Sequence, residues 1–301
     1  YHEDFPHYGD RQHPMRNCPD CTNEHRNFDR YLDYMHAQVR ELCSNYGKID
    51  IMWFDFSYDD MRGERWRASE LVDMVRTLQP GIILNNRLEC SGEGFGSLAE
   101  GHPAPYHGDF VSPEKIIPPR GLFDPNGNPV YWEVCATMNR NWGYCATDND
   151  YKSADMLIKK LVECVSKGGN FLLNIGPDAN GAIPPRAAQT LDEIGRFMHF
   201  NAQSIYGCTR SSVPKPEWGR ITQNGNMLYL HVYENTLGPL PLYGIPAQHI
   251  DSIRLLSTGH EIPLSHSWVH SDYPDMAFAD LGPDPTLADE TDTVLQLAWK
   301  E

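Results

Sequence analysis

Two charged side chains stand directly after short apolar segments of this chain. Asp55 follows Met52-Trp53-Phe54, and Arg87 follows Ile82-Ile83-Leu84 and two asparagines. A carboxylate placed in this way can act as a nucleophile or a general base, although it can equally cap a helix or meet solvent. Arg87 can hold that carboxylate or bind a hydroxylated ligand, and a solvated ion pair is the alternative.

Acid/base work on an acetal requires a second carboxylate. The acidic residues that follow Arg87 offer six candidates, among which the pattern does not choose: Glu89, Glu93, Glu100, Asp109, Glu114 and Glu133. The sequence has no G-x-S-x-G elbow, no P-loop and no H-E-x-x-H motif, so acyl transfer, phosphoryl transfer and zinc proteolysis lack their usual motifs.

Three tryptophans lie near the ends of apolar segments: Trp53, Trp132 and Trp142. Aromatic rings of this kind form the stacking wall of a sugar site, and core packing explains them equally well.

The first two thirds of the chain alternate between helical and strand patterns. Apolar spacings of three and four predict helices over residues 23–46, 68–78, 152–165 and 185–200. Short apolar runs predict buried strands over residues 49–54, 82–84, 130–137 and 170–175. Such alternation predicts parallel βα units in a doubly wound sheet or a (β/α) barrel. Polar residues just past the strand ends favour the barrel, whose active sites lie at the C-terminal rim.

Beyond residue 211 the pattern changes to short alternating segments separated by turn residues. These segments cover residues 227–233, 239–243, 250–256 and 293–299 and predict an antiparallel β-sandwich. All eight cysteines precede this region. We therefore predict an α/β fold with two domains, a barrel domain over residues 1–210 and a β-sandwich over residues 211–301.

Composition narrows the classes of partner. The chain has 301 residues, with 41 Asp and Glu against 25 Lys and Arg, which gives a net charge of −16. This acidic balance argues against a nucleic-acid partner, because phosphate binding needs clustered basic residues. No apolar run approaches the ~20 residues that a membrane span requires.

One cysteine pair, Cys18-Pro19-Asp20-Cys21, has the C-x-x-C spacing of zinc and redox sites. No second pair follows at finger spacing, so we interpret it as a loop disulfide or two free thiols, with a metal or redox role as the alternative.

Several longer motifs resemble the α-L-fucosidases of glycoside hydrolase family 29. The most specific is the run from Val165 to Pro177, Val-Ser-Lys-Gly-Gly-Asn-Phe-Leu-Leu-Asn-Ile-Gly-Pro. The segments Trp132-Glu133-Val134-Cys135-Ala136-Thr137, Asn141-Trp142-Gly143-Tyr144 and Ala202-Gln203-Ser204-Ile205-Tyr206-Gly207 are also similar to that family. The resemblance extends over nearly the whole chain.

The resemblance implies roles for five residues. Asp55 matches the nucleophile at the end of the family's Leu/Met-Trp-x-Asp strand. Glu114, in Asp-Phe-Val-Ser-Pro-Glu, matches the acid/base of one subgroup. Arg87 matches the Arg of the Asn-Asp-Arg motif, although Asn86 replaces its Asp, and Trp53 and Trp142 match aromatic positions that line the fucose pocket.

The implied reaction is a double displacement that releases terminal α-L-fucose from fucosylated glycans with retained configuration. Asp55 attacks the anomeric carbon while protonated Glu114 donates to the leaving oxygen, and Glu114 then activates water. The two carboxyl groups are expected about 5 to 5.5 Å apart. The resemblance implies no cofactor and no metal, is compatible with a homo-oligomer, and suits a secreted, periplasmic or lysosomal enzyme.

One departure from the family concerns the start of the chain. Tyr1 to Pro6 resembles a loop after a later strand, so the chain corresponds to the family without the first part of its barrel, which includes a sugar-binding His-His pair. We therefore expect a partial (β/α)8-like barrel, an inactive or poorly folded isolated chain, and an active complete protein. A related exo-glycosidase acting on a fucose-like sugar and a non-catalytic carbohydrate-binding homologue are the alternatives.

Overall fold

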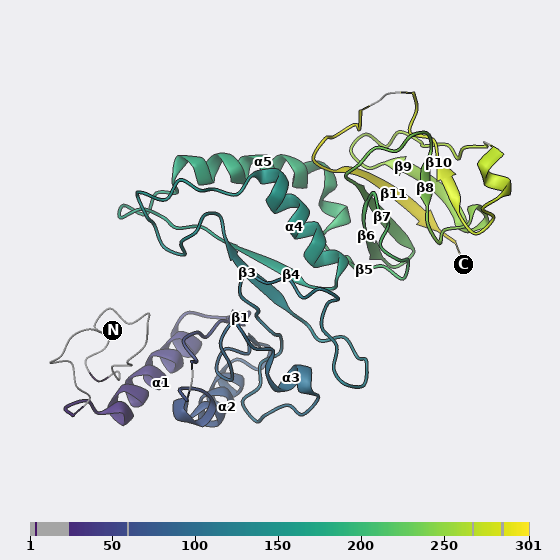
Figure 1. Cartoon of the computed structure of the whole chain (residues 1–301). Coiled ribbons are helices and arrows are strands. Elements are labelled where there is room, and N and C mark those ends of the chain that lie inside the picture. Colours follow the sequence, from purple (N-terminus) through teal and green to yellow (C-terminus); the bar gives the residue numbers. More distant parts are fainter. Residues whose placement is uncertain (1–3, 5–23, 59, 267, 284–285, 301) are drawn as a thin grey trace. The chain divides into compact units, whose positions relative to one another are not determined.

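The computed structural model describes residues 4, 24–58, 60–266, 268–283 and 286–300 (Figure 1). The chain divides into two compact units, Tyr1–Ser112 with Asp124–Asn126, and Pro113–Phe123 with Gly127–Glu301. The Cys18–Cys21 pair lies outside the described residues. The domain boundary near residue 210 falls inside the second unit and stays a prediction.

The first unit is built on two helices, α1 (Phe28–Asn45) and α2 (Ala68–Leu78). Helix α1 begins where the Asn27 side chain accepts a hydrogen bond from the Arg30 N–H at 3.1 Å, which satisfies one of the first unpaired donors. Apolar residues three and four apart then form one buried cluster between the helices. Smaller elements complete this unit: η1 (Gly63–Trp66), α3 (Gly96–Glu100), β1 (Ile51–Met52) and β2 (Ile83–Leu84).

Strands β1 and β2 pair in parallel with Ile51 opposite Ile83 and Met52 opposite Leu84. Leu84 is buried in the helical cluster and Met52 packs against it. Ile51 and Ile83 are 52% and 43% exposed. The prediction of fully buried strands is therefore wrong for these two positions, because successive side chains of a strand point to opposite faces and only one face meets the helices.

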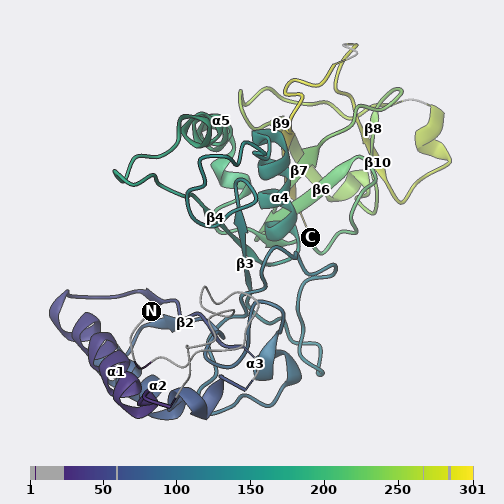
Figure 2. The ribbon, with the colours of Figure 1, turned by 60° about the vertical axis from the view of Figure 1, so that its left-hand side comes forward.

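The second unit begins with a parallel pair, β3 (Glu133–Thr137) and β4 (Asn170–Asn174), joined through helix α4 (Ala154–Ser166). Helix α5 (Pro185–Asn201) follows and packs against α4. Figures 1 and 2 show α4 between this pair and the antiparallel strands. The βα part of the fold prediction is confirmed at the level of these elements.

The connection from α4 to β4 is fixed by two glycines. Gly168 has φ +79°, a conformation that favours glycine, and its N–H and that of Gly169 bond back to the carbonyls of Val165 and Cys164. A Cβ on Gly169 would lie 2.2 Å from the Trp132 ring. The Gly-Gly pair therefore serves a turn and a close contact with the core, and Trp132, which is 1% exposed, is a core residue.

The rest of the second unit is antiparallel. Five strands form a sheet in the order β5-β6-β7-β11-β9, and β8 pairs with β10. Their bounds are β5 (Thr209–Arg210), β6 (Gly219–Asn224), β7 (Met227–Val232), β8 (Leu240–Leu242), β9 (Ile250–Leu255), β10 (Ala277–Ala279) and β11 (Thr293–Trp299). Three short helical turns lie beside them: η2 (Ala202–Ser204), η3 (Ala247–His249) and η4 (Trp268–Ser271).

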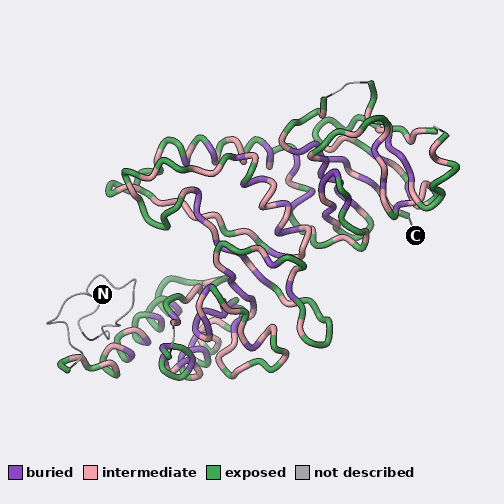
Figure 3. The backbone as a smooth tube through the Cα atoms, viewed as in Figure 1, coloured by how far each residue is buried: buried purple, intermediate pink, exposed green. Residues whose placement is uncertain are grey.

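The five-stranded sheet is packed on both faces, and most residues of β7 are buried (Figure 3). On one face, Leu228 and Leu230 of β7 join β8 and β10 in one apolar core. On the other face, Tyr229 packs against residues of α4 and α5. This alternation along β7 confirms the prediction of antiparallel layers at this end of the chain.

Candidate active site

The segment that carries Asp55 is held by a side chain rather than by a neighbouring strand. The Phe54 N–H donates to Asn85 Oδ1 at 3.0 Å, and Asn85 Nδ2 donates to the Phe54 carbonyl at 2.8 Å. Phe56, directly after Asp55, has φ 78°, a left-handed conformation that is uncommon for a bulky residue. The chain therefore turns sharply at Asp55, whose side chain stays 43% exposed.

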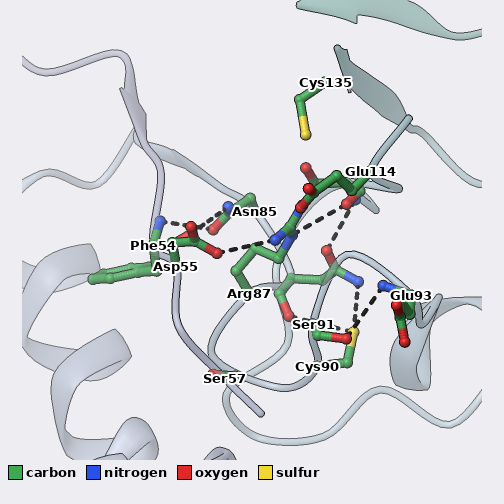
Figure 4. A network of polar contacts seen from close by, with 12 residues as sticks. Phe54, Asp55, Ser57, Asn85, Arg87, Cys90, Ser91, Glu93, Glu114 and Cys135 are labelled. Atoms are coloured by element: carbon green, nitrogen blue, oxygen red, sulfur yellow. Dashed lines mark hydrogen bonds and ion pairs between the residues drawn. The ribbon is translucent and has the colours of Figure 1, made fainter. Parts of the chain in front are cut away.

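Arg87 contacts both Asp55 and Trp53, the two other candidate site residues of the first unit. Its Nη1 donates to Asp55 Oδ1 at 3.0 Å, as Figure 4 shows, and its guanidinium carbon lies 4.8 Å from the centre of the Trp53 ring. Nε donates to the Ser112 carbonyl at 3.1 Å. The Arg87 side chain is only 1% exposed. A buried guanidinium needs a charged partner, and Asp55 supplies it.

Asn86 occupies the place where the resemblance leads us to expect an Asp. Its Oδ1 accepts from the Ser112 N–H at 2.9 Å, and its Nδ2 donates to the Phe95 carbonyl at 3.3 Å and to Cys90 Sγ at 3.0 Å. An amide can donate and accept at once, whereas a carboxylate only accepts. Asn86 therefore ties three loop segments together beneath Arg87.

In the second unit the structure brings Glu114 and Trp142 together. Trp142 Nε1 donates to Glu114 Oε1 at 3.2 Å. Glu114 forms an isolated parallel bridge with Cys135 of β3, which places it beside that strand (Figure 4). Asn174, the last residue of β4, donates from Nδ2 to the Trp142 carbonyl at 2.7 Å. The middle of β3 and the end of β4 thus position this pair.

Two of the other carboxylates considered for acid/base work have structural partners. Asp109 accepts from the Leu84 N–H at 2.8 Å and from Arg76 at 3.1 Å, so it fixes the strand before Arg87. Glu89 Oε1 accepts from the Ser97 N–H at 2.6 Å near the start of α3. These contacts explain two of the six candidates without catalysis.

Sequence reasoning missed the roles of Asn85 and Lys115. The Asn-Asn pair after a strand was visible, but nothing in it indicated that the first amide would bind backbone 31 residues away. Lys115 has φ 57° and lies against Trp142, and neither feature leaves a pattern in the sequence. Within the described part of the chain, no group of three or more His, Cys, Asp or Glu side chains is arranged to hold a metal ion.

Comparisons with known proteins show the family of the chain. Residues 3–203 match the sequence model of the Alpha-L-fucosidase family. The chain belongs to the alpha-L-fucosidase family. Every candidate site residue from Trp53 to Trp142 lies inside the matched range, whereas β6 to β11 follow it.

Individual fucosidases resemble the chain to different extents. The alpha-L-fucosidase of Dictyostelium discoideum is 30% identical over 68% of this chain and 42% of its own length. The human plasma alpha-L-fucosidase is 29% identical over 56% of this chain and 34% of its own length. The chain thus spans well under half of these curated relatives.

One solved fucosidase structure matches throughout. Alpha-L-fucosidase isoenzyme 1 from Paenibacillus thiaminolyticus covers all of this chain with a TM-score of 0.93 and 47% identity, and 70% of that protein is covered in return. The antiparallel strands beyond residue 203 therefore also have a counterpart in a fucosidase.

Proposed function

We propose that the protein carrying this chain is a retaining exo-α-L-fucosidase that removes terminal fucose from fucosylated glycans. Family membership supports the activity. The observation that carries the assignment of residues is the ion pair between Asp55 and fully buried Arg87, because it holds a partly exposed carboxylate at a strand end where a nucleophile is needed.

In this proposal Asp55 acts as the nucleophile. Arg87 holds Oδ1, and Oδ2 attacks the anomeric carbon as the bond to the leaving oxygen breaks. The ring of Trp53 and that of Trp142 offer apolar surface to the sugar's methyl group, a contact that discriminates against a hydroxymethyl analogue by ~1–3 kcal/mol.

Glu114 acts as the acid/base. It gives its proton to the leaving oxygen in the first step and takes a proton from water in the second, so that fucose leaves with retained configuration. The indole N–H of Trp142 donates to Oε1 and fixes the rotamer of the carboxyl group. The partial (β/α)8-like barrel that would unite these residues is part of the same proposal.

The decisive experiment replaces the nucleophile in the full-length protein. Asp55→Gly should lower kcat on an aryl α-L-fucoside by ~10⁴-fold or more, and sodium azide should restore part of the activity with formation of fucosyl azide. Asp60→Gly removes an exposed carboxylate five positions away and serves as the control. Unchanged turnover in Asp55→Gly would remove Asp55 from the mechanism.

The proposed compartment is outside the cytosol, either secreted, periplasmic or lysosomal. Relatives include enzymes called plasma and tissue alpha-L-fucosidase, which is consistent with a secreted or lysosomal setting. Among the described helices, none is long and apolar enough to cross a membrane.

A further inference from the structure

A cavity of about 340 Å³ lies between α4 and the β3–β4 pair in the second unit. Its floor is apolar, with Val134 and Phe171 from the two strands. Its charged lining consists of three lysines and one glutamate: Lys115, Lys152, Lys160 and Glu163. This basic lining is notable in a chain whose net charge is −16.

The three lysines differ in how their charges are compensated. Lys160 Nζ pairs with Glu163 at 2.9 Å. Lys152 Nζ donates to the backbone carbonyls of Thr137 at 2.6 Å and Asn139 at 3.1 Å, so two of its three protons are used and neither partner is charged. Among the described residues, no carboxylate forms an ion pair with Lys115 or Lys152.

The ammonium group of Lys115 acts on that of Lys152. Burial lowers the pKa of Lys152, the charge of Lys115 lowers it further, and the charge of Asp148 opposes both effects. Two like charges at one cavity disfavour each other, and a bound anion would relieve that repulsion. The first turn of α4, which begins after its N-cap Ser153, adds the positive end of a 13-residue helix beside Lys152.

This end of the cavity adjoins the proposed acid/base. Lys115 directly follows Glu114, and its Nζ lies 4.9 Å from the centre of the Trp142 ring. The same indole donates its N–H to Glu114. Lys115 adopts φ 57°, a conformation that glycine occupies at less cost, so this long cationic side chain stands at a strained backbone position.

We propose that Lys115 and Lys152 form an anion-binding subsite on the leaving-group side of Glu114. Its ligand is a sulfate or carboxylate substituent on the glycan from which fucose is cleaved. The proposal rests on the fucosidase function and deepens it by naming the substrate class, anionic fucosides. Carboxylate and sulfate oxygens accept charge-assisted hydrogen bonds from the ammonium groups, while the apolar floor accommodates the attached ring.

The first experiment compares three aryl α-L-fucosides in the full-length protein: a neutral one, one with a carboxylate on the aryl ring, and one with a sulfate ester at the same ring position. Lys115→Met keeps the methylene stem over Trp142 and removes the charge. The ratio of kcat/KM for an anionic over the neutral substrate should fall roughly five-fold, and Lys115→Arg should restore it. The two anionic substrates reveal which substituent the subsite favours.

Lys160→Met is the matched control, because it lines the same cavity but is already paired with Glu163. It should leave the ratio unchanged. In the wild type, added salt should reduce the ratio, because an exposed charge pair is screened. An unchanged ratio in Lys115→Met, or an equal fall in Lys160→Met, would overturn the proposal.

A second measurement does not depend on turnover. Titration of the wild type with sodium sulfate at constant ionic strength should give a saturable change in tryptophan fluorescence, since Trp142 contacts Lys115. Lys115→Met should abolish the change. If no fucoside is hydrolysed but sulfate still binds in this way, the proposed function fails and the anion site stands. If sulfate has no more effect than chloride, the anion site is refuted whatever the activity.

Discussion

Two regions of the molecule, the polar residues around Arg87 and the apolar core of the antiparallel strands, are held together by different interactions. Beneath Asp55, the residues from Asn85 to Arg87 and Ser112 are at most 2% exposed and are joined by directional hydrogen bonds. The apolar core of the antiparallel strands is instead formed by aliphatic side chains such as Leu230 and Leu295, which are fully enclosed.

The polar residues position the side chains of the candidate site, whereas the apolar core stabilises the fold. A hydrogen bond contributes a modest net free energy but fixes the distance and angle between two groups, whereas apolar burial is non-directional and contributes most of the stability of a fold. We therefore expect substitutions in the polar core to act mainly on catalysis and those in the sandwich mainly on the free energy of unfolding.

The largest effect is expected at Arg87. Arg87→Met removes the hydrogen bonds to Asp55 and to the Ser112 carbonyl, and loss of this positioning should lower kcat/KM on an aryl fucoside by roughly 10²- to 10³-fold. Arg76→Met, which breaks the partly exposed pair with Asp109, is the control and should act far less on turnover. Equal losses in the two variants would show that Arg87 has no special role.

The second largest effect is expected on stability, in the apolar core of the antiparallel strands. Leu295→Ala empties a site that is 0% exposed in the sandwich core and should lower the free energy of unfolding by about 2–5 kcal/mol. Denaturant unfolding measures this loss, and kcat per folded molecule should stay at the wild-type value. Leu237→Ala is the control, because Leu237 is fully exposed and should change stability little. A large fall in kcat for Leu295→Ala would contradict the expectation that this core affects stability and not catalysis.

The smallest effect concerns a charged cluster that joins α4 to β6. Glu163 accepts from Lys167 at 2.7 Å, from Lys160 at 2.9 Å and from Arg220 of β6 at 3.0 Å. Burial alone would raise the pKa of Glu163, but the two lysine hydrogen bonds and the charge of Arg220 outweigh it and lower the pKa to about 2.

Because the pKa of Glu163 is lower in the folded than in the unfolded state, its stabilisation is present above pH ~4.5 and is lost as the pH falls toward ~2. Glu163→Gln should therefore cost at most about 3 kcal/mol at pH 7, and the difference from the wild type should narrow below pH ~4.5. Denaturant unfolding at several pH values measures this, with exposed Glu290→Gln as the control. A difference that is independent of pH would contradict the assignment.

Local patterns predicted the regular elements well. Helix α2 and strand β11 have the predicted bounds, and α4 and α5 differ from prediction by one or two residues. The prediction is accurate for these segments because apolar periodicity and helix caps such as Ser153 depend only on residues that are close in sequence. Strand β6 was missed because its partly polar sequence, Gly219–Asn224, gains its strand pairing from β7.

The candidate site was predictable in its residue types but not in its supports. Asp55 and Arg87 were chosen from their places after two strands, and their ion pair is confirmed. The amide of Asn85 and the left-handed backbone of Lys115 depend on contacts between segments distant in sequence. The resemblance singled out Glu114 where the pattern of charges could not, and its catalytic role stays a prediction.

The Gly168–Gly169 turn has a consequence for how related genes are interpreted. The sequence run around this turn resembles the family most specifically. Its two glycines are nevertheless required by the end of α4 and by the close contact with the Trp132 ring. A homologue without carboxylates at the positions of Asp55 and Glu114 would still need the same turn to fold. Automated assignment of enzymes from this run would therefore count pseudoenzymes as active members. A census of active fucosidases should also examine the positions of Asp55 and Glu114, the proposed catalytic carboxylates.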